Sequence, residues 1–336
     1  MGLLLHFVIS VVYLITIDAQ EKNDARSTLQ RKLYSDEVLC DHNRGMNLDV
    51  NDTMVYFYDF QNNFTESFKV NDAFVGLTSS YHLNVTRKFI FFVMGYKANI
   101  TWSSSNVVTN TFRNVPNIYL MMVDHSVLGH KGGKRRNFEN SIMHSYYVGR
   151  ALGRLLSQLH GVGIPSRNIY CIGSSLGAQI LGYAGHSYMK ETREKIWRIT
   201  GLDPAGPCFS NSDVENQLRS GLADYVEVYH CNAGVFGTSS VLADIDVFVN
   251  DGRNQPYCHV PLRENVSAQC SHQSCLMYWI RSVERSDWLA LACDSYEDFI
   301  TGKCVGNEVA TVGYFNPGNS TGVFYATTEF NSPKKE

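Results

Sequence analysis

The sequence lacks the signatures of several classes of protein. Charged residues make up only 18% of the chain and the formal net charge is -3, which leaves no basic excess for binding nucleic acid. No tract rich in proline, glycine or serine and no internal repeat divides the chain, so a single domain is expected. No CxxC pair or cluster of histidine and cysteine has the spacing of zinc ligands, and we predict neither a metal nor a cofactor.

Long apolar runs are scarce as well. Residues 3–15 are mostly apolar, but this run is too short to span a bilayer, and a polar stretch follows the small residue Ala19. The pattern is typical of a secretory signal peptide at residues 1–19. No later stretch is long enough for a transmembrane helix. We therefore expect a secreted, extracellular protein formed by residues 20–336, with a frayed tail at 331–336.

Two further features agree with secretion. The chain has nine cysteines, and an odd number leaves at least one thiol unpaired; Cys171, inside an apolar run, is the candidate for a buried free thiol. Glycosylation sequons occur at Asn51, Asn63, Asn84, Asn99, Asn265 and Asn319. Both features predict a glycoprotein with disulfides.

Continuous apolar runs alternate with helical patterns, as in parallel sheets that helices cover on both faces. The predicted strands are residues 55–58, 88–94, 118–123, 169–172, 197–202, 225–229 and 245–249. Residues 141–159 have apolar side chains at helical spacing and predict a crossover helix. The predicted fold class is α/β, with a mostly parallel central sheet.

The central motif is Gly-Ser-Ser-Leu-Gly at residues 173–177, between a predicted strand and a helix start rich in small residues. This is the setting of a nucleophile elbow, in which a strained turn exposes a serine and small neighbours let strand and helix approach it. The five residues alone also fit a tight glycine-rich turn. In this setting they predict Ser175 as a nucleophile, with the dipole of the following helix beside the developing oxyanion.

A serine nucleophile needs a base and an acid that orients the base, which in this kind of fold follow in the order Ser, Asp or Glu, His. Asp203 follows the predicted strand 197–202 at the carboxyl edge of the sheet and is the candidate acid; a plain Asp-Pro turn is the alternative. Three histidines come after it: His230, His259 and His272. The pattern does not choose between them, and His230 also fits a hydrogen-bonded structural imidazole.

Two backbone amides are needed to bind the oxyanion, one after the nucleophile and one from a loop after an earlier strand. The buried strand 88–94 is followed by Gly95 and Tyr96. The amides of Tyr96 and Leu176 are therefore the candidate pair.

Taken together, these residues resemble the animal pancreatic-lipase family, and within it the short-lid branch that includes the phospholipase A1 enzymes of insects. The similarity extends from about residue 56 to residue 307, and its most specific parts are residues 173–185, 199–209 and 270–272. The resemblance implies an α/β-hydrolase fold. It also implies Ser175 as nucleophile, Asp203 as orienting acid and His272 as general base.

The resemblance further implies a lid loop closed by Cys258 and Cys270, and a second disulfide between Cys293 and Cys304. The lid holds 11 residues, fewer than in family members that are strict triacylglycerol lipases, and the flap at 231–242 is also short. Small flaps leave a cleft open to bulky polar headgroups. The expected function is release of the sn-1 acyl chain from a phospholipid at a membrane or emulsion surface, without a colipase partner.

Several residues depart from the family pattern. Met94, Ser174 and Gln179 stand where the family usually has histidine, Ser274 where it has arginine, and Arg219 replaces an acid of the calcium-binding run. Because Met94 and Ser174 flank the candidate oxyanion amides, we expect an altered rate or specificity. Two alternatives stay open: a triacylglycerol or galactolipid lipase, and a lipase-like protein that binds or stores lipid with little or no turnover.

Overall fold

The structure is a computed structural model that describes residues 42, 48–129, 133–261 and 263–328. The predicted signal peptide and C-terminal tail lie outside the described residues. The strands are β1 (Met54–Asp59), β2 (Phe64–Lys69), β3 (Lys88–Val93), β4 (Ile118–Asp124), β5 (Ile169–Ser174), β6 (Ile196–Leu202), β7 (Ala223–His230), β8 (Ile245–Val249), β9 (Leu289–Ala292), β10 (Val309–Thr311) and β11 (Gly322–Ala326). The helices are α2 (Ala73–Ser80), α3 (Ser103–Phe112), α4 (Gly133–Gly161), α5 (Leu176–Thr192), α6 (Glu264–Arg281) and α7 (Tyr296–Ile300), with short 3-10 turns η1 (Ser126–Gly129), η2 (Ser166–Asn168) and η3 (Val214–Asn216). Among the described residues, none of the helices is long and apolar enough to cross a membrane.

These eleven strands form one sheet in the order β10-β9-β11-β8-β7-β6-β5-β3-β4-β1-β2. The seven strands from β11 to β4 in that order are parallel, and antiparallel pairs flank them at both edges. In the middle of the sheet, Gly173 of β5 pairs with Val93 of β3 on one side and with Gly201 of β6 on the other. The carboxyl ends of β3, β5 and β6 therefore meet at one edge. This arrangement confirms the predicted α/β-hydrolase fold.

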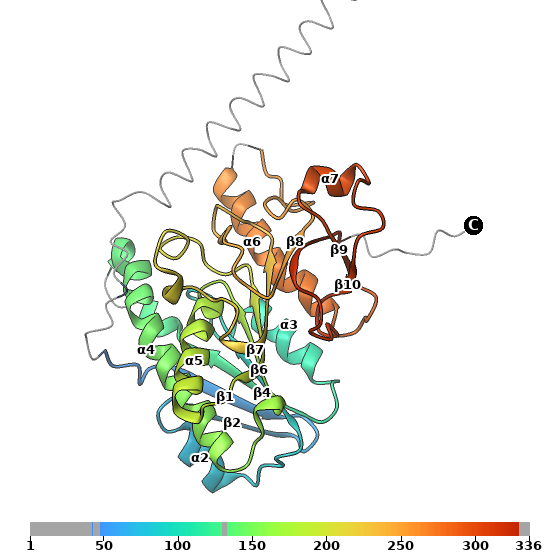
Figure 1. Ribbon diagram of the computed structural model, residues 1–336. Helices are drawn as coiled ribbons and strands as arrows, with labels where there is room; N and C mark the ends of the chain where they lie inside the picture. The colour runs from blue at the N-terminus through green and yellow to red at the C-terminus, as the bar shows by residue number, and fades with distance from the viewer. Residues whose placement is uncertain (1–41, 43–47, 130–132, 262, 329–336) are drawn as a thin grey trace, which may run out of the picture.

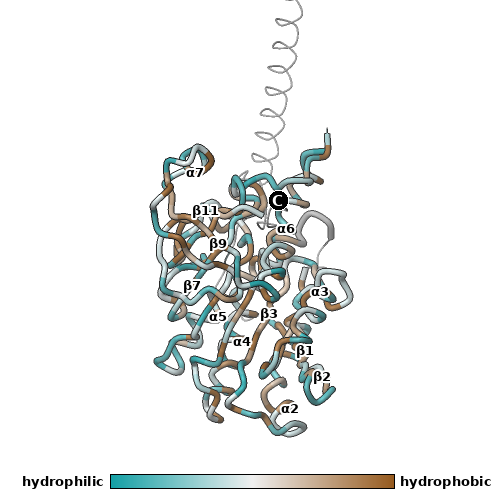
Figure 2. The backbone as a smooth tube through the Cα atoms, turned by 90° about the vertical axis from the view of Figure 1, so that its right-hand side faces the viewer, coloured by the Kyte–Doolittle hydropathy of each residue, from teal (hydrophilic) through white to brown (hydrophobic). Residues whose placement is uncertain are grey.

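Helices cover both faces of the sheet (Figure 1). On one face, α4 and α5 contribute buried side chains such as Leu152 and Ile180 to a large apolar cluster. On the other face, α3 and α6 contribute Phe112 and Trp279 to a second cluster. In Figure 2 the hydrophobic colour runs along β3 in the interior, as expected for a strand buried on both sides. The sheet is thus buried between two helical layers, and the loops that follow β3, β5 and β6 lie at its carboxyl edge.

The seven strands predicted from apolar runs are all present, as β1 and as β3 to β8. The helix predicted at 141–159 corresponds to α4, which is longer than expected because it begins at Gly133. The added first turns are polar in sequence, so the apolar spacing did not indicate them. Strands β2, β9, β10 and β11 were not predicted. In β2, at the sheet edge, half-buried and exposed side chains alternate, and β9 and β10 have only four and three residues. Neither β2 nor β10 carries a continuous apolar run, whereas β9 (Leu-Ala-Leu-Ala) and β11 (Gly-Val-Phe-Tyr-Ala) carry short apolar runs that were not predicted as strands.

A buried ion pair stabilises the β1 side of the sheet. Asp59, the last residue of β1, accepts hydrogen bonds from both terminal nitrogens of Arg87, at 2.8 and 3.0 Å, and from Tyr81 and Asn62. Burial opposes ionisation of Asp59, but the hydrogen bonds from Arg87, Tyr81 and Asn62 outweigh it and lower the carboxyl pKa to about 2. The ionised pair therefore contributes to the free energy of unfolding at neutral pH.

Replacing Asp59 by asparagine is expected to lower the free energy of unfolding at pH 7 by about 2 to 4 kcal/mol, because the buried Arg87 charge loses its partner. The difference in free energy of unfolding between the variant and the unmodified protein should become smaller as the pH falls from about 4 towards 2. A carboxyl whose pKa is lowered on folding loses its stabilising contribution when it takes up a proton. Urea denaturation at several pH values measures both effects. The matched control is Asp287→Asn, which breaks the exposed pair of Arg285 and Asp287 and should barely move the urea midpoint. Equal losses in the two variants would contradict this interpretation.

Candidate active site

Ser175 lies on the sharp turn between β5 and α5. Its backbone angles, φ 54° and ψ -120°, lie outside the regions that residues other than glycine ordinarily adopt. The flanking glycines leave the space that the turn needs: a Cβ at Gly173 would lie 2.6 Å from the backbone nitrogen of Ala178, and one at Gly177 would lie 2.2 Å from the carbonyl oxygen of Val93. The turn therefore has the strand-turn-helix geometry of a nucleophile elbow.

Asp203 is the first residue after β6 and is fully buried. Its Oδ1 accepts hydrogen bonds from the backbone amides of Cys231, at 2.7 Å, and Asn232, at 3.0 Å. Its Oδ2 accepts a hydrogen bond from Nδ1 of His272 at 2.5 Å. A Cβ at Gly237 would lie 2.4 Å from Oδ1, so the carboxylate occupies the space beside this glycine. Three donors hold the acid in one orientation.

His272 connects the other two residues. Its Nδ1 is bonded to Asp203, and its Nε2 lies 2.8 Å from Oγ of Ser175. A carboxylate can only accept, so Nδ1 carries the proton and Nε2 is left to accept from the serine hydroxyl. The imidazole side chain is 15% exposed, and the ring of Phe236 lies 5.8 Å away between centroids. This geometry can take a proton from Ser175 and give it back.

The other two candidate histidines lie elsewhere. His230 is fully buried, with Nε2 2.8 Å from Oδ1 of Asp246 and Nδ1 3.0 Å from the carbonyl oxygen of Thr238. Burial opposes its protonation, but the hydrogen bond and the charge of Asp246 outweigh burial and raise the pKa of His230. His230 is thus a hydrogen-bonded structural imidazole, the alternative that the sequence left open for it. His259 is exposed. Of the three histidines, only His272 is hydrogen-bonded to the elbow serine.

The two candidate oxyanion amides lie next to the serine. Leu176 begins α5, and a Cβ at Gly95, the residue before Tyr96, would lie 3.2 Å from Cβ of Ser175. Within the described part of the chain, neither the Tyr96 amide nor the Leu176 amide donates to a backbone acceptor in a loop or cap. Two such donors beside a nucleophile can bind an oxyanion.

Two of the residues that depart from the family pattern have structural contacts. The side chain of Met94 is buried in the core beside α3, with its sulfur 3.7 Å from Oγ of Ser105. Gln179, buried in α5, donates from Nε2 to the carbonyl oxygen of Ala205 and accepts from the amide of Leu218, both at 2.8 Å. Met94 thus belongs to the core, and Gln179 joins α5 to the segment that follows β6.

Three disulfides join described residues: Cys231–Cys275, Cys258–Cys270 and Cys293–Cys304. The second and third are the pairs that the resemblance implied, whereas the sequence left the first unassigned. Cys208 is also disulfide-bonded. Cys171 is a buried free thiol, which confirms the prediction, and burial raises the pKa of this thiol.

The lid differs in one respect from the sequence prediction. The sequence indicated a lid loop between Cys258 and Cys270, but α6 begins at Glu264, inside that segment. The second half of the lid and His272 itself therefore lie on the helix. Residues 264–270, the first turns of α6, are exposed or half-buried apart from the buried Ala268 and have no apolar stripe, so periodicity could not reveal them.

The sequon asparagines of the sequence lie at the surface. Asn99 is half-buried and the other five are exposed. Their glycosylation stays a prediction.

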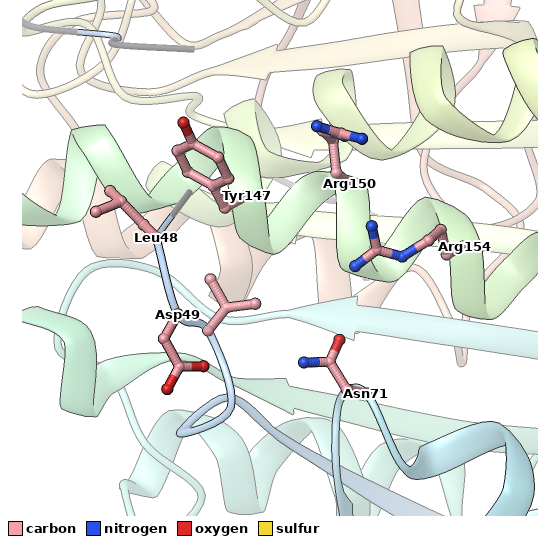
Figure 3. A pocket seen from close by; sticks show the side chains of 7 residues that line it. Leu48, Asp49, Asn71, Tyr147, Arg150 and Arg154 are labelled. Atoms are coloured by element: carbon pink, nitrogen blue, oxygen red, sulfur yellow. The ribbon is translucent and has the colours of Figure 1, made fainter. Parts of the chain in front are cut away.

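A separate hollow of about 320 Å³ lies between the segment before β1 and helix α4 (Figure 3). Tyr147, Arg150 and Arg154 project from α4, and Asp49 and Asn71 lie across from them in Figure 3. No residue of the Ser175 site lines this hollow, so it is not part of the candidate active site.

Sequence reasoning missed four neighbours of the candidate triad: Cys231, Asn232, Phe236 and Gly237. All four lie in residues 231–238, here called the Asp203 loop, which follows β7. Backbone amides that bind a carboxylate have no side-chain signature. The position of this loop could have indicated them, because it directly follows β7, the strand that pairs in parallel with β6, and so lies at the same edge of the sheet as Asp203.

Comparison with known proteins gives matches over most of the chain. A family model described as Lipase matches residues 24–328. Lipase member H-B of Xenopus laevis is 32% identical over 232 residues, covering 68% of this chain and 48% of that protein. Phospholipase A1 member A of Rattus norvegicus is 35% identical over 156 residues, covering 46% of this chain and 33% of that protein. The match thus spans about half the length of Lipase member H-B and about a third of the length of Phospholipase A1 member A.

Among solved structures, a putative carboxylesterase from Lactobacillus plantarum is similar with 9% identity and a TM-score of 0.30, over 67% of this chain and 77% of that one.

Proposed function

The chain belongs to the Lipase family, and from that premise we propose that it hydrolyses carboxylic esters of lipids, with Ser175 as nucleophile, His272 as general base and Asp203 as orienting acid. The observation that carries the proposal is the unbroken chain of hydrogen bonds from Oγ of Ser175 through His272 to Asp203. It satisfies the geometric requirement for a base within hydrogen-bond reach of the proton it removes.

In the proposed reaction, Oγ of Ser175 attacks the ester carbonyl carbon while Nε2 of His272 takes the hydroxyl proton. The negative oxygen of the tetrahedral intermediate accepts hydrogen bonds from the amides of Tyr96 and Leu176. His272 then protonates the leaving alcohol, and an acyl-enzyme forms. A water molecule, deprotonated by His272, then attacks the acyl carbonyl, and His272 returns this proton to Oγ of Ser175 as the acyl–oxygen bond breaks, which releases the fatty acid and restores the serine. Throughout, the Asp203 carboxylate stabilises the imidazolium.

We further propose a phospholipid as the preferred substrate, with release of the sn-1 acyl chain, which would place the chain in the short-lid, phospholipase A1-like branch of the family. The short loop closed by Cys258–Cys270 supports this, because it leaves little chain to cover the elbow. A relative named Phospholipase A1 member A agrees with it. The three disulfides among described residues support secretion, since disulfides persist mainly in oxidising compartments.

The test is hydrolysis of vesicles of 1-palmitoyl-2-oleoyl-phosphatidylcholine and of a triolein emulsion, with the early products identified by mass spectrometry. We expect palmitate and an oleoyl lysophospholipid as first products, and slower release of oleate from triolein. Oleate released first from the phospholipid, or faster hydrolysis of triolein, would contradict the phospholipase A1 assignment. Binding of both lipids without hydrolysis would instead favour a lipid-binding protein. The Ser175→Ala variant supplies the background in each assay.

A further inference from the structure

The disulfide Cys231–Cys275 joins the two segments that hold the acid and the base. Cys231 belongs to the Asp203 loop, and its backbone amide donates to Oδ1 of Asp203 at 2.7 Å. Cys275 lies on α6, three residues after His272. A single covalent bond thus connects a donor to the acid with the helix of the base.

Both cysteines are buried, and their Cα atoms are 5.5 Å apart. A third group lies beside the disulfide. The carbonyl oxygen of Tyr229 accepts a hydrogen bond from the backbone amide of Asp203 at 2.8 Å and lies 3.4 Å from Sγ of Cys275. The acid, its loop and the helix of the base therefore converge on a small region of the core behind the active site.

Residues three apart on a helix share a face, so His272 and Cys275 point from α6 towards the same region. His272 attaches the helix there by a hydrogen bond to Oδ2 of Asp203, and Cys275 attaches it by a covalent bond to the loop that holds Oδ1. With two points of attachment, α6 cannot rotate or slide without moving the acid as well.

We propose that the Cys231–Cys275 disulfide is a positioning element of the active site, which fixes the imidazole of His272 relative to both Asp203 and Ser175. This inference rests on the proposed function. A misplacement of about 1 Å in a catalytic group can cost about 10²-fold in rate, so a covalent tie at this point affects turnover and not only stability.

The chain contains a matched control. Cys293–Cys304 closes a shorter loop between β9 and β10, with a sequence separation of 11 against 44 for Cys231–Cys275, and its cysteines pack with Tyr325 in a small cluster that contains no triad residue. Losing this disulfide removes a cross-link of the same chemistry at a place where it cannot orient the base.

The experiment compares Cys231→Ala/Cys275→Ala with Cys293→Ala/Cys304→Ala. Alanine at position 231 keeps the backbone amide that donates to Asp203, so the change is confined to the two buried sulfur atoms and the bond between them. For a soluble short-chain ester, with active enzyme counted by fluorophosphonate titration, we expect the first variant to lose about 10- to 100-fold in kcat with little change in KM. The control should keep kcat within about twofold, as expected for a substitution remote from the chemistry.

A spectroscopic readout separates positioning from general stabilisation. The Nδ1 proton of His272, shared with Asp203, should give a low-field proton resonance in the unmodified protein and in the control. In the variant without the Cys231–Cys275 bond, we expect this resonance to broaden or disappear. A merely structural role would leave it intact in the folded fraction.

Wild-type kcat and an unchanged resonance in the folded Cys231→Ala/Cys275→Ala protein would overturn the inference, and so would equal losses of kcat in both double variants. If the alanine pair does not fold, Cys231→Val/Cys275→Ala restores apolar volume without the bond and is held to the same outcomes. Failure of the unmodified protein to hydrolyse the ester or to label with fluorophosphonate would contradict the proposed function instead. The proton resonance still tests the geometry in that case.

Discussion

Replacing Ser175 by alanine is expected to lower kcat for ester hydrolysis by at least about 10⁴-fold, because the variant lacks the hydroxyl that forms the acyl-enzyme in the proposed reaction. Ser175 Oγ is hydrogen-bonded to Nε2 of His272, and it makes no side-chain hydrogen bond that caps α5, so the elbow does not depend on this oxygen for its shape. The fold should therefore be retained, and KM for a soluble ester should change little. Steady-state kinetics with the purified, secreted variant gives the measurement.

The control for this prediction is Ser157→Ala, which removes a hydroxyl whose one hydrogen bond to a described residue goes to the carbonyl oxygen of Gly153 within α4. It should keep activity near that of the unmodified protein. If Ser175→Ala retained more than a small fraction of the activity while still folding, the nucleophile would have to be another residue.

The second large effect is expected for Asp203→Asn, at about 10⁴-fold in kcat. Oδ1 of Asp203 accepts two backbone amides, so the asparagine oxygen would take that place and its NH₂ group would face Nδ1 of His272. Nδ1 must then accept, which moves the imidazole proton to Nε2. The imidazole would donate to Ser175 and could no longer remove its proton.

Because asparagine has nearly the same shape as aspartate, and the imidazole proton only moves from one ring nitrogen to the other, Asp203→Asn should keep its fold and still bind lipid surfaces. Near-UV circular dichroism and vesicle sedimentation measure these two properties. Asp224→Asn, at an exposed position of β7, is the matched control and should leave kcat unchanged. A loss of less than about tenfold in folded Asp203→Asn protein would mean that the acid does not set the tautomer of His272.

Much of the sheet can be predicted from the sequence for a physical reason. Parallel strands buried on both faces are continuous apolar runs, and β3 and β4 are apolar almost throughout. The strands that escaped prediction are those at or near the edges, where β2 alternates and β10 is very short. Their pairing depends on neighbours far away in the sequence, which periodicity does not contain.

Some residues of the candidate site could likewise be predicted from the sequence, and others could not. Ser175 and Asp203 were predicted because each directly follows a buried strand, and the sheet brings the ends of adjacent parallel strands together. His272 could be selected only through the family resemblance, since it lies on a helix whose start has no apolar pattern. The amides that hold Asp203 are backbone groups, and the pairing of Cys231 with Cys275 is one of many that nine cysteines allow. These contacts arise from tertiary structure alone.

The central claim, that His272 activates Ser175 for attack, is tested most directly by fluorophosphonate labelling followed by peptide mass spectrometry. In the unmodified protein we predict a covalent adduct on Ser175, formed rapidly and with a stoichiometry near one per chain. In the folded His272→Ala variant, labelling should slow by about 10³-fold or more, because the hydroxyl has no base. An adduct on a different residue, or equally fast labelling of Ser175 without His272, would contradict the claim.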